Sequence, residues 1–589
     1  MKNKYYSIIL IIGIVLAITS CDVTNTVPED AITDLNYWTK TDDLKQYANS
    51  FYTTLSGPSQ WYDTSSDNAV TNSPDNKLFN NLVVPGSGGG WSTGDWGNIR
   101  NLNYFLNRYQ TVVGDESVIN HYVGEIRFFR ANEYFNKVKT FGDVPWYDVD
   151  LTTADDDLLM KGRDPRKFVV DKILEDLDFA VSNLKEHDEI EKGRLHKYAA
   201  LQLKARVALY EGTWMKYRNI SGWESYLEQA VLAASEIMNS GNYDIVKGNA
   251  QYMFDDKPLY YRQQFIQEDL TDNPESVLPR IYEKDILMHG ISRSVNETGW
   301  GISKDFIESF LCIDGKPIAL SDLYEGDGTF LKELENRDPR FRNMVDNPYL
   351  PYFLDGEIPI SYPATTIAVN QCPTGYMASK FRSPIPAQNE ANQTTYDWHI
   401  FRYAEVLLIF AEAKAELGTI TQQDIDNSIN KLRARLDEPG KFEMGRLFLN
   451  PPLDPLSVVN GSPRYGYAID PLLYEIRRER RIELAFEGFR WDDIVRWKAG
   501  KLIENPKTML GLTVNDEVVN RYTEVFGGTN PFATRSFYEF TDWAGNQKKL
   551  LKVYENMNRT WDDRLYLNPL PIDQLQLNPN LGPQNPGWE

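Results

Sequence analysis

Apolar residues recur at helical spacing along two long parts of the chain. They stand three and four residues apart, which places them on one face of an α-helix. Ala199, Leu203 and Ala208 belong to one such stripe, whose small side chains let a neighbouring helix approach closely. This periodicity predicts helices over residues 40–55, 96–110, 116–140, 165–186, 196–216, 223–239, 400–417, 423–436 and 471–499.

Paired amphipathic helices with short connections favour a mostly α fold, with a scaffold of tetratricopeptide-like helical hairpins. The strict repeat signature is absent. Residues 240–399 are instead rich in Gly, Pro, Asn and Asp, so a loop-rich ligand-binding module is expected to be inserted into the scaffold. One domain is expected over residues 34–589, with scaffold at about 34–240 and 400–500 and an irregular C-terminal segment at 505–589.

The N-terminus has the pattern of an exported lipoprotein. Lys2 and Lys4 precede an apolar run, Tyr5 to Thr19, that is too short to span a ~30 Å hydrocarbon core comfortably. The run ends in Ile-Thr-Ser before Cys21, a lipobox-like cleavage site. We therefore expect a signal peptide at residues 1–20, a lipidated Cys21 and a tether at 21–33. The alternative is a short membrane anchor with a chance cysteine.

Composition excludes several classes of protein. The formal net charge is −22, which disfavours nucleic-acid binding because phosphates would be repelled. The 5 histidines are scattered, and no HExxH, GxSxG, P-loop or GxGxxG motif is present. No metal, cofactor or catalytic residue is therefore expected. Cys312 and Cys372 could pair, although a chain with so large a core does not need a disulfide.

Three glutamates raise the question of catalysis. Glu479, Glu483 and Glu487 lie four residues apart on one expected helix face, and paired carboxylates are typical of glycosidases. Arginines stand among them, however, and arginines lower the pKa of a carboxyl group, whereas a general acid needs a raised pKa. We therefore expect an ion-paired structural helix that includes Asp492 and Asp493.

Six ordered segments resemble the SusD/RagB-like outer-membrane lipoproteins of the Bacteroidetes. Glu475–Trp497 (EIRRERRIELAFEGFRWDDIVRW) is the most specific match, and the C-terminal segment Tyr566–Trp588 ends in NPNLGPQNPGW. The others are Asp34–Tyr52, Glu125–Tyr147 with its Gly-Asp-x-Pro turn, Gly193–Tyr210, and Arg402–Gly418 with Asn430–Arg435.

The resemblance implies a function and a partner. Such proteins lie on the outer face of the outer membrane, cap a SusC-like TonB-dependent transporter and deliver nutrients to it, usually oligosaccharides and sometimes peptides. Their fold is α, with four tetratricopeptide-like helix pairs that pack on the transporter. A non-catalytic carbohydrate-binding lipoprotein is therefore expected. A peptide-binding member of the family and a surface glycan hydrolase stay open as alternatives.

Tryptophans in polar loops are the candidate ligand platforms, because an aromatic face can stack on a sugar ring. Trp61, Trp91 and Trp300 have this setting, and the resemblance places them in regions that usually contact sugar. Asp67, Asn68, Arg293 and Asn296 are expected to contribute polar contacts, with Tyr62, Tyr349, Tyr352, Tyr396 and Trp398 as further candidates. The tryptophans expected in the core are Trp38, Trp146, Trp214, Trp491, Trp497, Trp543 and Trp588.

Overall fold

The structure is a computed structural model that describes residues 37–247, 253–254, 257–258, 260–295, 299–347, 372–437, 441, 443–525, 527–542 and 545–589. The expected signal peptide and lipidation residue lie outside these residues, as do Asn296, Tyr349, Tyr352 and Trp543. None of the described helices is both long enough and apolar enough to cross a membrane.

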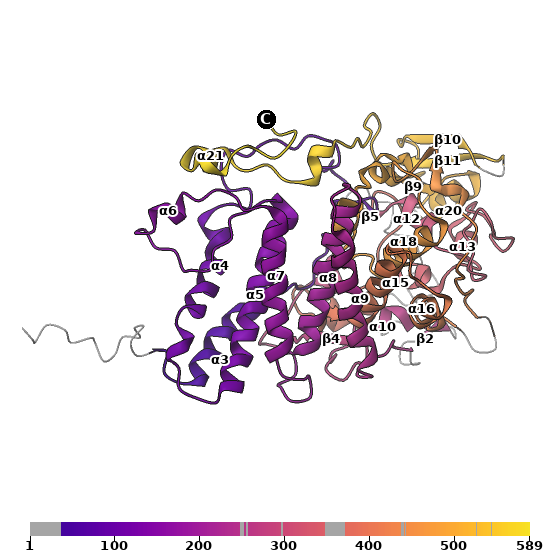
Figure 1. Cartoon of the computed structure of the whole chain (residues 1–589). Helices are drawn as coiled ribbons and strands as arrows, with labels where there is room; N and C mark the ends of the chain where they lie inside the picture. The colour runs from indigo at the N-terminus through magenta and orange to yellow at the C-terminus, as the bar shows by residue number, and fades with distance from the viewer. Residues whose placement is uncertain are drawn as a thin grey trace, which may run out of the picture.

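Long helices from the first part of the chain form a scaffold. They are α3 (Thr41–Asn49), α4 (Thr93–Leu106), α5 (Glu116–Phe141), α7 (Arg166–Asn183), α8 (Lys197–Lys216) and α9 (Trp223–Asn239). Figure 1 shows them upright, and α5 packs on α4 and α7 while α8 packs on α7 and α9. Two later helices, α15 (Tyr403–Glu416) and α18 (Pro471–Glu483), continue the layer beyond α9. The expected mostly α fold with a helical-hairpin scaffold is confirmed.

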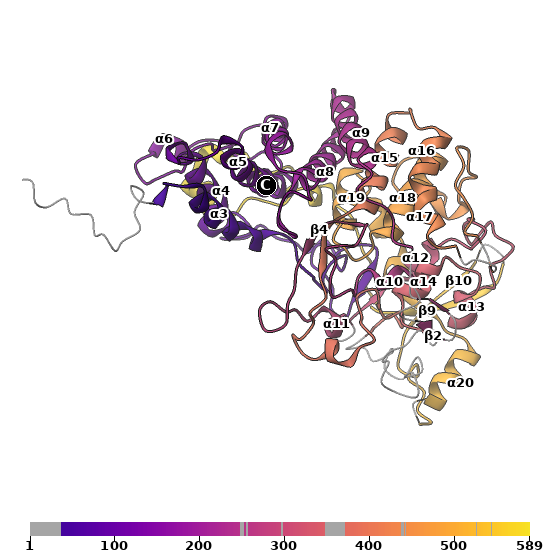
Figure 2. The same ribbon diagram turned by 90° about the horizontal axis from the view of Figure 1, so that it is seen from below.

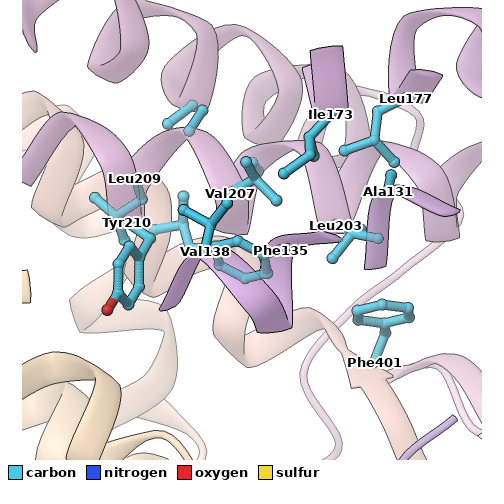
Figure 3. Packing of buried hydrophobic residues seen from close by; sticks show 14 of the residues in the cluster. Ala131, Phe135, Val138, Ile173, Leu177, Leu203, Val207, Leu209, Tyr210 and Phe401 are labelled. Carbon is cyan, nitrogen blue, oxygen red and sulfur yellow. The ribbon is translucent and has the colours of Figure 1, made fainter. Parts of the chain in front are cut away.

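The apolar stripes of the scaffold helices meet in a continuous core. Figure 3 shows Val138 of α5, Ile173 of α7 and Val207 of α8 gathered between the helices, and all three are fully buried. Burial of such a side chain contributes ~1.5–3 kcal/mol to folding. Gly212 of α8 allows the close approach of α9, because a Cβ there would lie 2.6 Å from the Leu227 side chain.

The inserted module consists of short elements joined by loops. Its strands pair across long sequence distances: β4 (Ser276–Arg280) pairs antiparallel with β6 (Trp398–Arg402), and β1 (Ala69–Thr71) pairs antiparallel with β5 (Trp300–Ile302). The helices are α10 (Tyr260–Gln263), α11 (Ile291–Ser294), α12 (Lys304–Ser309), α13 (Phe330–Leu334), α14 (Pro339–Met344) and the 3-10 turn η4 (Pro386–Asn389). A core distinct from that of the scaffold, with Phe306 and Phe341 among its members, holds these elements together.

The segment at 505–589 is more regular than the sequence suggested. It contains helix α20 (Asp516–Val525) and a sheet in which β11 (Gln547–Lys552) lies between β10 (Phe537–Thr541) and β9 (Leu510–Thr513). β10 and β11 are short and only partly buried, and β9 is buried but has only four residues, so all three are weak sequence signals.

The last residues form a strap that closes one end of the scaffold. Figure 1 shows this segment, with α21 (Ile572–Leu577), running across the ends of the N-terminal helices. The side chain of Asn585 donates a hydrogen bond to the Phe141 carbonyl at the end of α5. Trp588 is buried, and its indole donates to the Leu567 carbonyl. The C-terminal motif therefore has a packing role.

Two expected helices are each divided. Two helices, α16 (Gln422–Asn427) and α17 (Ile429–Ala434), take the place of the one expected over 423–436. The range 471–499 contains α18 and α19 (Arg490–Arg496), and the break carries positive φ angles at Phe486 and Gly488. The φ of 63° at Phe486 is costly for a non-glycine residue, and burial of its ring against Trp300 and Phe306 offsets that cost.

Buried ion pairs connect α18 to the module. Glu483 accepts hydrogen bonds from Arg340 at 2.9 Å, from Arg402 at 2.8 Å and from Arg435. Glu479 pairs with Arg340 and Arg433, and Glu487 pairs with Arg402 and Lys380. Glu487 lies beyond the end of α18, in the turn before α19, so of the three glutamates the expectation of an ion-paired structural helix is confirmed for Glu479 and Glu483 only. Asp493 belongs to it through Arg480 and Arg496, whereas Asp492 pairs with Lys139 of α5.

Replacing Glu483 with Gln is expected to destabilise the protein strongly, because it leaves the buried guanidinium groups of Arg340, Arg402 and Arg435 with too little negative charge. Breaking a buried pair in this way costs ~3–5 kcal/mol. Urea denaturation followed by circular dichroism measures this loss. Glu175→Gln is the control, since Glu175 pairs with Lys172 on the exposed surface of α7 and should lose less than about 1 kcal/mol. Equal losses in the two variants would contradict the structural role of the buried pairs.

Candidate functional site

Trp61 presents its ring to solvent from a tight turn. Its side chain is 54% exposed, which is unusual for a tryptophan. The turn is closed by hydrogen bonds from the backbone and the hydroxyl of Thr64 to the Trp61 carbonyl, at 3.2 and 2.7 Å. The Trp61 amide donates to the hydroxyl of Ser59. The backbone around the exposed ring is therefore ordered locally.

Tyr62 turns inward and anchors the same loop. Its hydroxyl donates to the Gly57 carbonyl at 2.9 Å, and its ring lies 6.3 Å from that of Trp398. The ring also packs on Gly488, where a Cβ would lie 3.1 Å from it. Tyr62 is directed inward, whereas the preceding Trp61 is directed outward. Tyr62 supports the exposed tryptophan from behind.

Asp67 and Asn68, expected as ligand contacts, are fully buried structural anchors. The carboxylate of Asp67 accepts two 2.7 Å hydrogen bonds from Arg490, and the amide oxygen of Asn68 accepts one from Arg481. Burial opposes ionisation of Asp67, but Arg481 and Arg490 outweigh it and hold the pKa of Asp67 below its usual range. Asp63, also buried, accepts from the Phe486 amide at 2.7 Å. The loop is therefore fastened to the break between α18 and α19.

A second segment faces Trp61 across a hollow of about 470 Å³. This segment is α11 with the turn at Ala391 and Asn392, and it brings Arg293 to the same hollow as Trp61. Trp61 and Arg293, both expected from the sequence, are thus brought together. Further lining residues are Pro58, Ser59, Gln60, Gly290, Ile291 and Ser294.

Hydrogen bonds within the module hold this second wall in place. The hydroxyl of Ser292 in α11 donates to the side chain of Asn389 at 2.8 Å. The backbones of His289 and Thr394 exchange two hydrogen bonds, which fix α11 beside the turn at Asn392. Burial lowers the pKa of His289 to about 4, so this imidazole is neutral at neutral pH. The wall is preorganised, which lowers the entropic cost of ordering it around a ligand.

Trp91 is a core residue, and the expectation of an exposed platform is wrong for it. Only 4% of its surface is exposed, and its ring packs edge-on against Trp96 and Phe141 at 5.2 and 4.8 Å. The glycine run before it is a turn with positive φ angles at residues 88–90. This turn directs Trp91 into the scaffold core just before α4 begins, so the glycines have a backbone role.

Trp300 is also buried, at 3% exposure, and is likewise no exposed platform. It lies in β5 opposite Thr71 of β1, and its ring contacts Phe486 at 5.5 Å. The further candidates Tyr396 and Trp398 are buried in the module core as well. Of the tryptophans expected in the core, Trp38, Trp146, Trp214, Trp497 and Trp588 are buried and Trp491 is half-buried.

Sequence reasoning missed polar residues that line the hollow. Ser59 and Gln60 directly precede Trp61, so they could have been predicted as lining residues from their place in the same loop. Asn392 reaches the hollow from a turn far along the chain, where its φ is 56°. Nothing in the sequence around Asn392 indicates that this turn lies opposite Trp61.

The glutamates that could suggest hydrolysis are committed to arginines. Burial opposes ionisation of Glu483, but Arg435, Arg402 and Arg340 outweigh it and keep the pKa of Glu483 below its usual range. The pKa values of Glu479 and Glu487 are lowered in the same way by their own cationic partners. None of these groups has the raised pKa of a general acid. Among the described residues, no cluster of His, Cys, Asp and Glu is arranged to hold a metal ion, and Cys312 and Cys372 are buried free thiols.

The architecture defines a tetratricopeptide-like helical protein with an inserted module, and known proteins share it. A family model described as the SusD family matches residues 283–588, more than half of the chain. SusD-like protein P2 of Formosa agariphila is 24% identical, with 99% of this chain and 100% of that protein aligned. A solved SusD-like protein from Bacteroides fragilis is 25% identical, covers 94% of this chain and 98% of its own, and has a TM-score of 0.65.

A second solved structure, a SusD-like carbohydrate binding protein from Bacteroides fragilis, is similar over 93% of this chain and 100% of its own. Its TM-score is 0.66 at 20% identity, which supports the same fold. The chain belongs to the SusD family.

Proposed function

We propose that this protein is a non-catalytic, lipid-anchored glycan-binding protein of the cell surface, and that its ligand stacks on Trp61. The exposed Trp61 ring at the hollow is the observation that carries the proposal. Family membership and the carbohydrate binding named for one structural relative support the ligand class. The ion pairing of Glu479, Glu483 and Glu487 favours binding over hydrolysis.

The chemistry of the hollow suits a saccharide. An indole face packs against the C–H face of a sugar ring, while hydroxyl groups need donors and acceptors around it. Ser59, Gln60 and Asn392 offer both, and Arg293 adds a cation. Stacking contributes roughly 0.5–1.5 kcal/mol per aromatic contact beyond area burial, so affinities on the order of micromolar to millimolar are expected. Such weak binding allows release to a transporter.

Delivery to a SusC-like TonB-dependent transporter is the second part of the proposal. Sequence resemblance supports it and also the position on the outer face of the outer membrane, while the lipobox at Cys21 supports a lipid anchor. The transporter would supply the route across the membrane.

Trp61→Ala should weaken glycan binding at least about tenfold, because it removes the stacking surface and the area that a sugar would bury. Affinity electrophoresis of the full-length protein, in native gels cast with starch, xylan, laminarin, galactomannan or pectin, measures the retardation. The melting temperature should stay near the wild-type value, since the Trp61 side chain is largely exposed.

Two variants serve as controls for this experiment. Phe168→Ala removes another exposed aromatic ring, on α7 and outside the hollow, and should leave retardation unchanged. Trp91→Ala should cost ~3–5 kcal/mol of stability because Trp91 is core. If Trp61→Ala keeps full retardation in every gel that retards the wild type, the proposed site is wrong. If the wild type binds peptide libraries and no polysaccharide, the peptide-binding alternative replaces the glycan.

Cys21→Ala should move the protein from the membrane fraction to the soluble fraction, because no lipid can then be attached. Purification of the wild type in mild detergent should also recover a much larger outer-membrane protein, the transporter, as gel electrophoresis and mass spectrometry would show. A Cys21→Ala variant that stays in the membrane fraction overturns the anchor. Recovery of the lipoprotein alone, under conditions that keep other outer-membrane complexes intact, overturns the partnership.

A further inference from the structure

A second hollow, of about 230 Å³, lies away from Trp61. It is bounded by α12, by the loop from Asp454 to Tyr465 and by one face of β10. Figure 2 shows α11, which borders the Trp61 hollow, well apart from β10. The two hollows also have no lining residue in common, so they are separate.

An aromatic pair from β10 forms one wall of this hollow. Tyr538 and Phe540 are two residues apart, so their side chains lie on the same face of the strand. Their rings are 5.8 Å apart and tilted by 36°, and both side chains are only half-buried. The neighbouring Phe537 packs against the module core instead. The pair thus forms a small apolar platform outside the core.

The position of this pair needs a physical reason. β10 is an edge strand, because in its sheet it pairs only with β11. Exposed aromatic residues on an edge strand favour unwanted strand pairing and aggregation, so proteins usually place charged residues there. Charged Glu539 is indeed exposed on the opposite face of the strand. The aromatic platform at the hollow departs from that rule. An apolar patch outside the core is typical of a binding surface.

The floor of the hollow contains a buried donor without an acceptor. Arg490 is 3% exposed, and its Nε and Nη2 atoms donate to Asp67 at 2.7 Å. Its Nη1 atom has no hydrogen-bond partner among the described residues. Nη1 is itself enclosed by protein atoms, so Arg490 contributes positive charge to the floor of the hollow rather than a donor that a ligand can reach.

Charges around the hollow are mixed in sign. Lys507 pairs with Glu308 at 2.6 Å, Arg464 pairs with Asp305, and Arg478 pairs with Asp454. A phosphate or sulfate group would meet these carboxylates as well as the cations. Hydroxyl groups both donate and accept hydrogen bonds, so a neutral sugar can use both kinds of partner. The Lys507 ammonium lies 5.1 Å from the Phe540 ring centroid, so donors border the aromatic platform directly.

We propose that this hollow is a second saccharide-binding site, in which a neutral sugar ring stacks on Tyr538 and Phe540 and its hydroxyl groups bind the Lys507 ammonium and the Glu308 carboxylate beside the platform. The ligand class rests on the proposed function, whereas the location rests on the aromatic pair and the charged pairs around it. Two separate weak sites on one chain would hold a long polysaccharide more tightly than either alone, since the second contact forms at high effective concentration.

The test removes each site separately in the full-length protein. Affinity electrophoresis in the starch, xylan, laminarin, galactomannan and pectin gels compares Trp61→Ala with Trp61→Ala/Tyr538→Ala/Phe540→Ala. Trp61→Ala should keep part of the wild-type retardation in at least one gel. The triple variant should lose that remaining retardation in the same gel. Glu539→Ala, on the opposite face of the same strand, is the matched control and should behave like the wild type.

A further variant covers the case in which the aromatic substitutions disturb the sheet. Val458 is 45% exposed and lines the hollow, so Val458→Arg would place a long side chain across it without changing the core. Added to Trp61→Ala, it should also abolish the remaining retardation.

The outcomes separate the two proposals. The second site is overturned if Trp61→Ala alone removes all retardation. It is also overturned if the triple variant and the Trp61→Ala/Val458→Arg variant are retarded as strongly as Trp61→Ala. In both cases the Trp61 site stands. If the wild type is retarded in none of the gels, both the proposed function and the ligand class of this hollow fail.

Discussion

The arginines of α18 and α19 are almost fully buried, and the fold depends on carboxylates from distant segments that meet them. Asp67 comes from the loop that follows Trp61, Glu416 lies at the end of α15, and Asp305 comes from α12. Removing such charges from water is expensive, so each guanidinium requires well-placed partners. A chain that satisfies all of them has few alternative arrangements. The pairs therefore position the module on the scaffold.

This constraint also explains why one aromatic side chain remains exposed. The segment from Asp63 to Asn68 is fastened to the break between α18 and α19, and Tyr62 is packed on Gly488 in the same region. Trp61 stands immediately before these anchors, at a turn with no core to enter. Its exposure thus follows from the burial of its neighbours, and it faces a wall that hydrogen bonds have already ordered.

Helices such as α3 and α9 were predictable because their apolar residues follow a 3.6-residue periodicity, whereas α5 and α8 are apolar and buried on several faces, so length and helix-forming composition carry more of their signal. The divided helix at 471–499 was not predictable, since its break depends on the packing of Phe486 against residues far away in sequence. The same limit applies to the tryptophans. Trp61 and Trp91 both stand in polar loops, and only tertiary contacts with Trp96 and Phe141 distinguish the buried one. Helix α18 contains more arginines than glutamates. This excess indicates in the sequence that acidic residues from elsewhere, such as Asp67, pair with the arginines.

A structure of the full-length protein bound to the polysaccharide fragment that it retains most strongly tests the central claim most directly. The account predicts a sugar ring stacked on the Trp61 indole, with hydroxyl groups within hydrogen-bond distance of Gln60, Arg293 or Asn392. It also predicts that the buried pairs between Asp67 and the arginines Arg481 and Arg490 are unchanged on binding. A bound fragment that leaves Trp61 free in solvent and occupies no part of this hollow would contradict the account.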